Sequence, residues 1–348
     1  MPLTLEGGRI PPRWAAEKTL RAAGNTGESH APAKRLRIAL INNMPDSALE
    51  DTESQFFSLL ESAAGDLPVG VKLFSLPGIP RREAALRHVN EFYLSTDELS
   101  REKFDGAIIT GTEPRQPDMR DEPYWNALGE VMDWAAGETT STVLSCLAAH
   151  ASVLFSDGIQ RHPLREKTLG VFAHEKVCAH PLLRGTPQRI PIPHSRWNEV
   201  RESELVSRGY GILTKSAHSG ADMFVKQMKR SLFVHFQGHP EYGAKTLLKE
   251  YRRDIKRFLR RERDDYPALP RGYFDAAAEA ILFDFQKQAV ADPREERMAA
   301  FPEAAVTGTL RNSWSEPATR IYRNWLEYLA LKKAEGAPMP SMVRAGHE

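Results

Sequence analysis

Residues 141–155 read "STVLSCLAAHASVLF" and join a strand-like run to a helix-like run at a single residue. Residues 141–145 form a short run typical of a strand, and from Leu147 onward small and apolar residues continue as a helix. Cys146 occupies the joint. A strand that turns into a helix at one residue lifts that side chain above the sheet, and the first N–H groups of the helix point toward it. The joint therefore predicts a cysteine nucleophile, and a buried structural cysteine is the alternative interpretation.

Short apolar strands alternate with helices on both sides of this joint. Strands are predicted over 36–42, 69–76, 104–111, 141–145, 209–217, 221–227 and 231–238. Helices are predicted over 47–65, 124–137, 146–155, about 246–267 and 318–333. This alternation predicts an α/β fold, a doubly wound and mostly parallel sheet flanked by helices, with antiparallel strands at one edge.

The composition is that of an ordinary globular protein. Of 348 residues, 41% are hydrophobic and 27% are charged, and 47 Lys and Arg against 46 Asp and Glu give a net charge of +1. A balanced charge argues against a global attraction to nucleic acid or anionic lipid. Because the sequence shows no run of about 18 apolar residues and no apolar signal segment, we expect no membrane span and a cytoplasmic location, where both cysteines stay free thiols.

Three parts of the chain can be separated by their patterning. Residues 1–34 are rich in Pro, Gly, Ala and charge without a lasting period, which predicts a flexible arm. Residues 35–335 are expected to form a single domain that ends in an enlarged helical segment from about residue 250, and residues 336–348 a tail. The connection over 267–306 either covers the site or mediates self-association, and the sequence does not decide between these roles.

Candidate catalytic residues gather in turns that follow predicted strands. Reactive groups of an open α/β sheet lie at the carboxyl ends of its strands, where the turns "NNMPDS", "TGTEP", "SC" and "QGHPEY" occur. In the last turn, His239 and Glu241 flank Pro240, so the imidazole can face a thiol while the carboxylate orients it. A simple surface turn is the alternative. Cys178 and His235 are expected to be structural.

Other polar groups indicate no further site. The eleven histidines lack a spacing with cysteine or carboxylate that suggests zinc, so we expect no bound metal. The runs "KRFLRR" and "RRERDD" in the C-terminal part are expected to form a solvated helix face and to bind no nucleic acid.

The joint at Cys146, "QGHPEY" (237–242) and "TLLKEYRRD" (246–254) together resemble the homoserine O-succinyltransferase family, which has the class I glutamine amidotransferase fold. The resemblance covers roughly residues 36–330, in order and with nearly constant spacing. Further matching stretches are "NEFYLSTDELSREKFDGAIITG" (90–111), "PYWNALGEVMDWA" (123–135), "REKTLGVFAH" (165–174), "HPLLRG" (180–185), "PHSRW" (193–197) and "YRNWLEY" (322–328).

The resemblance implies a role for each of the catalytic candidates. Cys146 receives the acyl group of an acyl-CoA as a thioester, His239 acts as general base and acid, and Glu241 orients His239, in a ping-pong scheme. The oxyanion hole uses the backbone N–H of Leu147 and of the turn around Gly111 and Thr112.

Three further residues match substrate-contacting positions of the family. Arg253 would bind the α-carboxylate of the acceptor, for which its bidentate guanidinium is suited. Without the family, Arg253 would be one more charge in a basic run. Lys167 would meet an acidic group and Ser195 a hydroxyl or an amine. The implied reaction is succinyl transfer from succinyl-CoA to the hydroxyl of L-homoserine in methionine biosynthesis, without a bound cofactor, in a homodimer.

Two turns depart from the family pattern and bear on specificity. Asp46 and Ser47 stand where relatives carry basic residues, which predicts the loss of a positive charge near the site. Arg115 occupies the position that tunes the acyl group, where glycine accompanies succinyl and glutamate accompanies acetyl in relatives. Because a cation suits the free carboxylate of a succinyl group, Arg115 favours succinyl over acetyl.

Four alternative functions stay open at the level of sequence. Acetyl-CoA is the alternative donor, and serine or another hydroxy amino acid is an alternative acceptor. A glutamine amidotransferase-like cysteine hydrolase would use the same nucleophile and histidine–glutamate pair. A binding protein that has lost its activity would not need Cys146, His239 and Glu241 together.

Overall fold

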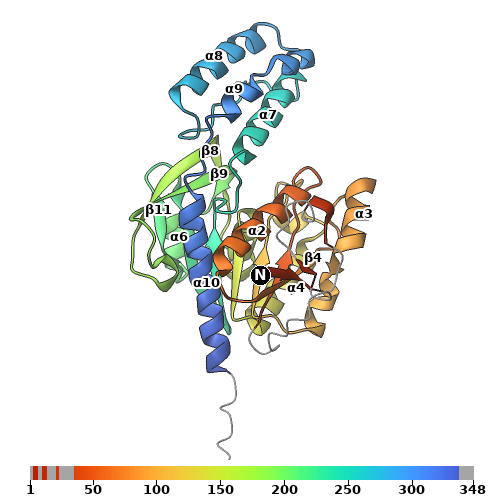
Figure 1. Cartoon of the computed structure of the whole chain (residues 1–348), viewed down its shortest axis with the longest axis vertical. Helices are drawn as coiled ribbons and strands as arrows, with labels where there is room; N and C mark the ends of the chain where they lie inside the picture. The colour runs from red at the N-terminus through yellow and green to blue at the C-terminus, as the bar shows by residue number, and fades with distance from the viewer. Residues whose placement is uncertain (1–2, 7–9, 14–20, 23–34, 337–348) are drawn as a thin grey trace, which may run out of the picture.

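A ten-stranded sheet runs through the protein (Figure 1). The structure is a computed structural model that describes residues 3–6, 10–13, 21–22 and 35–336. The strand order is β10-β13-β14-β7-β6-β3-β4-β1-β2, with β5 paired to β4. Neighbours from β14 to β2 are parallel, and β10 and β13 add antiparallel strands at one edge. This arrangement confirms the predicted mostly parallel, doubly wound sheet and its antiparallel edge.

The strands of this sheet are short. Their bounds are β1 Leu3–Leu5, β2 Arg21–Ala22, β3 Leu36–Ile41, β4 Val69–Ser75, β5 Leu94–Ser95, β6 Gly106–Ile109, β7 Ser141–Ser145, β10 Gly211–Ile212, β13 Met223–Met228 and β14 Ser231–Phe236. The strands β3, β6, β7 and β14 are buried on both faces, which explains their nearly continuous apolar sequences.

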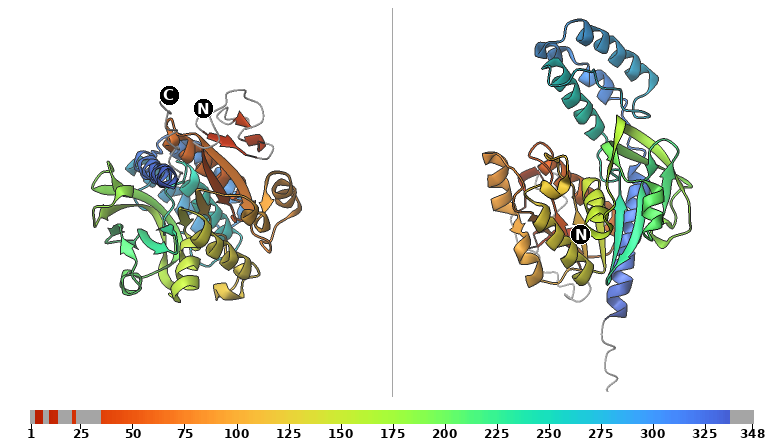
Figure 2. Two further views of the ribbon diagram at one scale, coloured as in Figure 1. Left: turned by 90° about the horizontal axis from the view of Figure 1, so that it is seen from below. Right: turned by 180° about the vertical axis from the view of Figure 1, so that it is seen from behind.

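Helices cover both faces of the sheet, as Figures 1 and 2 show. On one face, α2 (Leu49–Ala64) and α10 (Ser315–Glu335) pack side by side against β3 and β4. On the other, α4 (Trp125–Glu138) and α5 (Leu147–Asp157) pack against β6 and β7. The peripheral helices and turns are α3 Glu83–Phe92, α6 Glu202–Ser207, η2 Thr96–Arg101, η3 Met119–Asp121, η4 Pro181–Leu183 and η5 Glu295–Ala300.

A second, four-stranded sheet lies beside the first and was not predicted. Its order is β12-β11-β8-β9, and the long antiparallel pair β8 (His162–Lys176) and β9 (Arg189–Glu199) dominates it. The remaining strands are β11 Thr214–Ser216 and β12 Gly220–Ala221. Exposed charged residues interrupt the burial pattern of β8, so its sequence lacks the strict alternation by which a half-buried strand is recognised.

A helical lobe extends from the end of the molecule where β8 and β9 lie (Figure 1). It consists of α7 (Thr246–Leu259), α8 (Ala276–Ala291) and α9 (Glu303–Thr307), which share a hydrophobic core of their own. Arg271 attaches the lobe to β8, because its N–H donates to Leu169 O (3.0 Å) and its carbonyl accepts from Val171 N (2.8 Å). Gly170 permits this close approach, since a Cβ there would lie 2.2 Å from Arg271 O.

The first residues of the chain differ from the predicted flexible arm. Leu3–Leu5 form β1, which pairs in parallel with β4, and Leu3 and Leu5 are fully buried in the core. A strand of three residues is too short to be recognised from the sequence of a Pro- and Gly-rich segment. Most of the remaining residues of 1–34, and the predicted tail after residue 336, lie outside the described residues.

Among the described residues, no helix is long and apolar enough to cross a membrane.

Candidate active site

Cys146 lies at a sharp corner between β7 and α5. Its φ of 53° and ψ of −112° are uncommon for a residue with a side chain, and its backbone N–H donates to Phe236 O at 2.8 Å. Since β7 and β14 are neighbouring parallel strands, this hydrogen bond fixes the corner to the end of β14. Cys146 is half-buried, so its thiol is held at the carboxyl edge of the sheet without being shut into the core.

His239 and Glu241 follow β14 and meet this corner. His239 Nδ1 lies 2.9 Å from Glu241 Oε1, and the imidazole lies close enough to the Cys146 side chain for the two groups to interact electrostatically. Ser145, the last residue of β7, donates its hydroxyl to the same Glu241 oxygen at 3.0 Å. The turn thus brings together the three residues predicted to form the catalytic triad, and Ser145 adds a fourth that the sequence did not indicate.

The charges of this turn act on the pKa of His239. Burial disfavours the charged imidazolium, but the neighbouring Cys146 and Glu241 outweigh burial and raise the pKa of His239 well above its ordinary value. A cationic imidazole next to a cysteine is the arrangement by which cysteine enzymes activate their nucleophile for attack on a carbonyl.

The Gly111–Thr112 turn, predicted to supply backbone N–H groups to an oxyanion hole, lies against the residue that follows the nucleophile; its role as a donor stays a prediction. Gly111 follows β6 and packs against the first turn of α5, where a Cβ on Gly111 would lie 2.7 Å from Leu147 Cβ and 3.0 Å from Leu147 N. The turn Gly111–Thr112 and the N-terminus of α5 are therefore in direct contact. Only glycine fits this contact without a shift of the backbone that carries the proposed donors.

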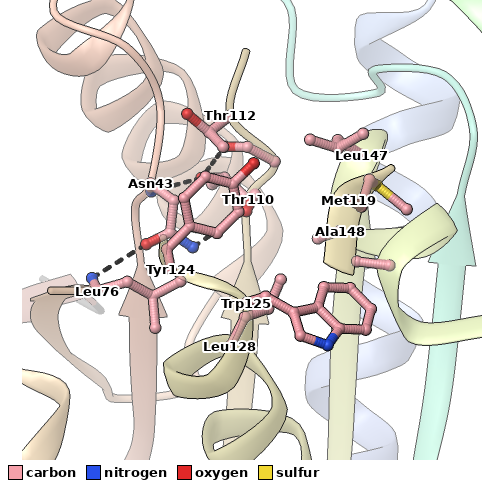
Figure 3. Close-up of a pocket in the computed structure, with 12 residues that line it drawn as sticks. Asn43, Leu76, Thr110, Thr112, Met119, Tyr124, Trp125, Leu128, Leu147 and Ala148 are labelled. Carbon is pink, nitrogen blue, oxygen red and sulfur yellow. Dashed lines mark hydrogen bonds between the residues drawn. The ribbon is translucent and has the colours of Figure 1, made fainter. Parts of the chain in front are cut away.

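A mostly apolar pocket lies next to the Gly111–Thr112 turn and Leu147 (Figure 3). Its walls come from the turns after β3 and β6 and from α4 and α5, and the residues labelled there include Asn43, Thr112, Tyr124, Leu128 and Leu147. Asn43 ties two strand ends together, because its N–H donates to Thr110 Oγ1 at 2.8 Å and its Oδ1 accepts from Leu76 N at 3.2 Å. Asn43 thus holds the end of β6, just before the Gly111–Thr112 turn, against the end of β4.

The three predicted substrate-contacting residues come together at the start of the helical lobe. Lys167 Nζ lies 2.8 Å from Asp254 Oδ2 and 3.4 Å from Glu250 Oε2. The Ser195 hydroxyl donates to the same Glu250 oxygen. Arg253 Nη2 lies 3.5 Å from Glu250 Oε2, and its Nε lies 3.3 Å from Asp254 Oδ1. We name these five residues the acceptor cluster.

Glu250 and Asp254 of this cluster stay ionised. Burial acts to raise the pKa of both carboxyl groups, but the charge of Lys167, followed by Arg253, outweighs it and lowers both pKa values. Lys167 contacts acidic groups of the protein itself, and its predicted contact with an acidic group of a substrate stays a prediction. Arg253 is the most exposed member, with 42% of its side chain accessible, and can still reach a ligand.

Sequence reasoning missed Glu250 and Asp254, although a signal for them existed. Glu250, Arg253 and Asp254 are spaced i, i+3 and i+4 on α7 and therefore share one face of the helix. The opposite face is apolar and buried in the lobe. The sequence predicts this charged face of α7. That it contacts β8 and β9 could be inferred only once the second sheet was known.

The departures from the family pattern fall on two exposed turns. The loss of a positive charge at Asp46 and Ser47, relative to the family, stays a prediction; in this chain Arg81 Nη1 donates to Met44 O at 3.0 Å and lies 3.6 Å from Asp46 Oδ1. A guanidinium from the segment after β4 thus reaches this turn. Arg115 is exposed on the turn after β6, and its backbone N–H donates to the Glu122 carboxylate. Its role in acyl specificity stays a prediction.

A buried polar network lies behind the turn that carries His239. Its residues are His174 of β8, His194 of β9 and Asp222, and Asp222 contacts the turn through Gly238. His174, His194 and Asp222 place ligand-type atoms within 4.8 Å of one another, although they are far apart in the sequence. His194 Nδ1 accepts from Arg196 Nε at 3.2 Å, which leaves the proton on Nε2, 3.5 Å from Asp222 Oδ1. The same Asp222 oxygen accepts from Gly238 N at 2.7 Å.

Two buried atoms of this network, His194 Nε2 and Asp222 Oδ2, make no hydrogen bond. The buried Arg196 guanidinium places a positive charge against His194, which disfavours a second cation there. The spacing of histidines along the sequence cannot show that three distant residues meet in the fold. Spacing alone therefore gave no test of a metal site at His174, His194 and Asp222. The absence of a bound metal stays a prediction. His235 is packed as predicted, stacked on Phe224 with ring centroids 4.7 Å apart.

The arrangement is that of enzymes that transfer acyl groups with a cysteine. A cysteine at a strand-to-helix corner lies beside a histidine–glutamate pair, and the first turn of the following helix contacts the Gly111–Thr112 turn. The amino-acid sequence also matches a known protein family over most of its length. The family model described as homoserine O-succinyltransferase matches residues 15–335, and the chain belongs to this family. It is an acyltransferase.

Curated relatives resemble the chain over nearly its whole length. Homoserine O-succinyltransferase of Methylorubrum extorquens is 43% identical over 323 residues, which cover 93% of this chain and 96% of the relative. The enzymes of the same name from Rhodopseudomonas palustris and Bradyrhizobium japonicum are 42% and 44% identical. They cover 86% and 89% of this chain, and 90% and 95% of their own lengths.

Solved structures with a similar course of the chain include two glutamine amidotransferases. The enzyme from Methylobacillus flagellatus has a TM-score of 0.47 at 13% identity and covers 85% of this chain and 95% of its own. The enzyme from Thermotoga maritima has a TM-score of 0.43 at 14% identity and covers 85% of this chain and 98% of its own.

Proposed function

We propose that this chain transfers the succinyl group of succinyl-CoA to the hydroxyl of L-homoserine and releases O-succinylhomoserine and free CoA. The proposal rests on one observation: Cys146, His239 and Glu241 lie together, and the acceptor cluster lies next to them. A hydrolase of the glutamine amidotransferase type would use the same catalytic residues and would also bind an amino acid, so the match to the homoserine O-succinyltransferase family favours acyl transfer over it.

In the first half-reaction, the Cys146 thiolate attacks the thioester carbonyl of the donor. The N–H groups of Leu147 and of the Gly111–Thr112 turn stabilise the resulting oxyanion. The bond between the carbonyl carbon and the CoA sulfur breaks, and the His239 imidazolium gives its proton to the departing thiolate. Free CoA leaves, and the acyl group stays on Cys146 as a thioester.

In the second half-reaction, the acceptor hydroxyl attacks this thioester. Neutral His239 takes the hydroxyl proton, and Glu241 stabilises the imidazolium that forms. The carbon–sulfur bond to Cys146 then breaks, which returns the thiolate–imidazolium pair. Each half-reaction uses His239 once as acid or base, so the protonation of the enzyme is unchanged after a full cycle.

The acceptor cluster offers complementary charges for an amino acid. The exposed guanidinium of Arg253 suits the α-carboxylate, and the carboxylates of Glu250 and Asp254 suit the α-ammonium. Ser195 and Lys167 hold Glu250 in place from the second sheet. Binding of the acceptor would replace contacts that the cluster makes internally.

Arg115 is the residue that we propose favours succinyl over acetyl. It is exposed on the turn that also carries the proposed oxyanion donors, and a succinyl group ends in a free carboxylate that a guanidinium can bind. In Arg115→Glu, the ratio of succinyl-CoA to acetyl-CoA use should fall. An unchanged ratio would remove Arg115 from the determinants of specificity.

The function is tested by a matrix of two donors and two acceptors. Succinyl-CoA and acetyl-CoA are each combined with homoserine and serine, and free thiol is measured. The proposal predicts the fastest release of CoA for succinyl-CoA with homoserine. Faster reaction with acetyl-CoA or with serine would change the assignment of donor or acceptor, and ammonia release from glutamine would favour a hydrolase.

Three further features belong to the proposal. The enzyme uses acyl-CoA as a substrate and needs no bound cofactor, since Cys146 itself carries the acyl group. It acts in the cytoplasm, where a reducing environment keeps that thiol free. It forms a homodimer, which the mass measured by light scattering in solution would test.

A further inference from the structure

Tyr242 lies between the catalytic histidine and the acceptor cluster. Its ring stacks on the imidazole of His239, with centroids 4.1 Å apart and planes inclined by 14°. Its hydroxyl donates to Glu250 Oε1 at 2.7 Å. One side chain thus contacts the base through its face and the acceptor cluster through its polar end.

The position of this ring is fixed at several points. The backbone N–H of Tyr242 donates to His239 O at 3.1 Å, and its carbonyl accepts from Trp314 Nε1 at 2.6 Å. The side chain is 8% exposed and belongs to the core of the helical lobe. Because backbone, ring and hydroxyl are all held, Tyr242 cannot turn away from His239 without breaking the contacts that join the lobe to the sheet.

The charges around Tyr242 suit both contacts. Burial, followed by the charge of Glu250, raises the pKa of Tyr242 well above its ordinary value, so the phenol keeps its proton and donates it to the Glu250 carboxylate. The face of a phenol ring is electron-rich and attracts a cation stacked on it. The ring therefore favours the imidazolium form of His239.

We propose that Tyr242 is a positioning residue with two separable functions: its ring stabilises the imidazolium of His239, and its hydroxyl aligns Glu250 so that the bound acceptor faces the base. The second function rests on the proposed acyl transfer to an amino acid, whereas the first needs only the thiolate–imidazolium pair. Two variants separate them. Tyr242→Phe keeps the stacked ring and removes the hydroxyl, and Tyr242→Leu removes the ring as well.

The function of the ring is tested without any substrate. In a Cys178→Ser background, which removes the exposed second thiol, the rate at which iodoacetamide alkylates Cys146 is followed against pH. Tyr242→Phe should keep the wild-type profile. In Tyr242→Leu, the rate near pH 6 relative to that near pH 9 should fall about threefold to tenfold, because the imidazolium that supports the thiolate is less stable. Superimposable profiles for Tyr242→Leu and wild type would overturn this function.

The function of the hydroxyl is tested in the two half-reactions. Tyr242→Phe should raise the KM for homoserine about tenfold, the effect of losing one hydrogen bond to a charged group. The burst of CoA released from succinyl-CoA without acceptor should be unchanged, because Glu250 takes no part in that step. An unchanged KM for homoserine, or an equal loss in both half-reactions, would overturn the function of the hydroxyl.

A matched control is available at Tyr210. This buried tyrosine also donates to a carboxylate, Asp157, at 2.7 Å, and packs against a histidine, His235, with centroids 5.6 Å apart. Tyr210→Phe should leave the alkylation profile and the KM for homoserine unchanged. If wild type transfers no succinyl to homoserine, the proposed function fails, while the alkylation profiles still decide on the ring of Tyr242.

Discussion

Replacement of Glu241 by glutamine tests the electrostatic part of the site with the least change in shape. Glu241 Oε1 accepts hydrogen bonds from His239 Nδ1 at 2.9 Å and from Ser145 Oγ at 3.0 Å, and the carboxylate is nearly buried. The amide oxygen of glutamine can still accept both hydrogen bonds. The variant therefore removes a negative charge next to His239 while it keeps most of the local geometry.

The size of the effect follows from the separation of the charges. Two unit charges about 4 Å apart interact by about 4 kcal/mol at an effective dielectric constant of about 20. Since the glutamine dipole retains part of this interaction, the transition state in which His239 takes the acceptor proton should lose about 3 kcal/mol. This corresponds to a decrease of about a hundredfold in kcat/KM for homoserine.

The pH dependence gives the same variant a second readout. In the acyl-enzyme the thiolate of Cys146 is consumed, so Glu241 remains as the group that raises the pKa of His239. The kcat/KM for homoserine should rise as His239 loses its proton. Removing the charge of Glu241 lowers the pKa of His239, so in Glu241→Gln this rise should occur at lower pH than in wild type.

The assay is steady-state release of free thiol at saturating succinyl-CoA, with homoserine varied between pH 5 and 9. Glu204→Gln is the control, because Glu204 forms a similar pair with His162 at 2.7 Å on the surface; its activity should stay within about twofold, as for surface substitutions. A Glu241→Gln variant with a kcat/KM within a few-fold of wild type, or with an unshifted pH profile, would refute the electrostatic role of Glu241.

Three further substitutions test neighbouring parts of the site. His239→Ala should lower kcat/KM at least about a hundredfold through loss of the general base, and activity within a few-fold of wild type would exclude His239 from the mechanism. Gly111→Ala should lower kcat at least about tenfold, because its methyl group would displace Leu147 at 2.7 Å; an unchanged kcat with a wild-type Tm would count against the proposed oxyanion hole. Arg253→Lys should raise the KM for homoserine about tenfold and leave the CoA burst unchanged, since lysine cannot form the bidentate contact, and a reduced burst would place Arg253 elsewhere in the reaction.

The central sheet could be predicted because its signals are local. Residues 141–145 are buried on both faces and carry a continuous strand pattern, and the joint at Cys146 is visible in the residues themselves. The signal for a helix end is equally local where a glycine follows the last turn. Gly65, which has a positive φ, ends α2 in this way. The predicted bounds of β3, β4, β7, α4 and α5 differ from those observed by only one or two residues at most ends.

The second sheet could not be predicted because its pattern depends on tertiary contacts. β8 carries exposed charges such as Arg165 and Glu166 next to residues that bury only against β9 and the lobe. Its irregular pairing, with a register shift between Pro163 and Thr168, also disturbs the alternation of side chains. The sequence indicated the motifs of this sheet only through the family resemblance.

Of the candidate site, the grouping of Cys146, His239 and Glu241 could be predicted, and the contacts that support this grouping could not. His239 and Glu241 lie two residues apart, so their pairing is a local property of one turn. Ser145, Glu250 and Tyr242 act through contacts that join β7, α7 and the turn after β14. Such contacts depend on the packing of distant segments, on which spacing along the chain gives no information.

The proposed acyl transfer requires that Cys146 carry the acyl group. Enzyme mixed with succinyl-CoA without acceptor is quenched in acid, digested and analysed by mass spectrometry, with a parallel sample to which homoserine is added before quenching. A succinyl adduct on the peptide that contains Cys146, discharged by homoserine, is the predicted result. An adduct confined to Cys178, or full activity in Cys146→Ala, would contradict it.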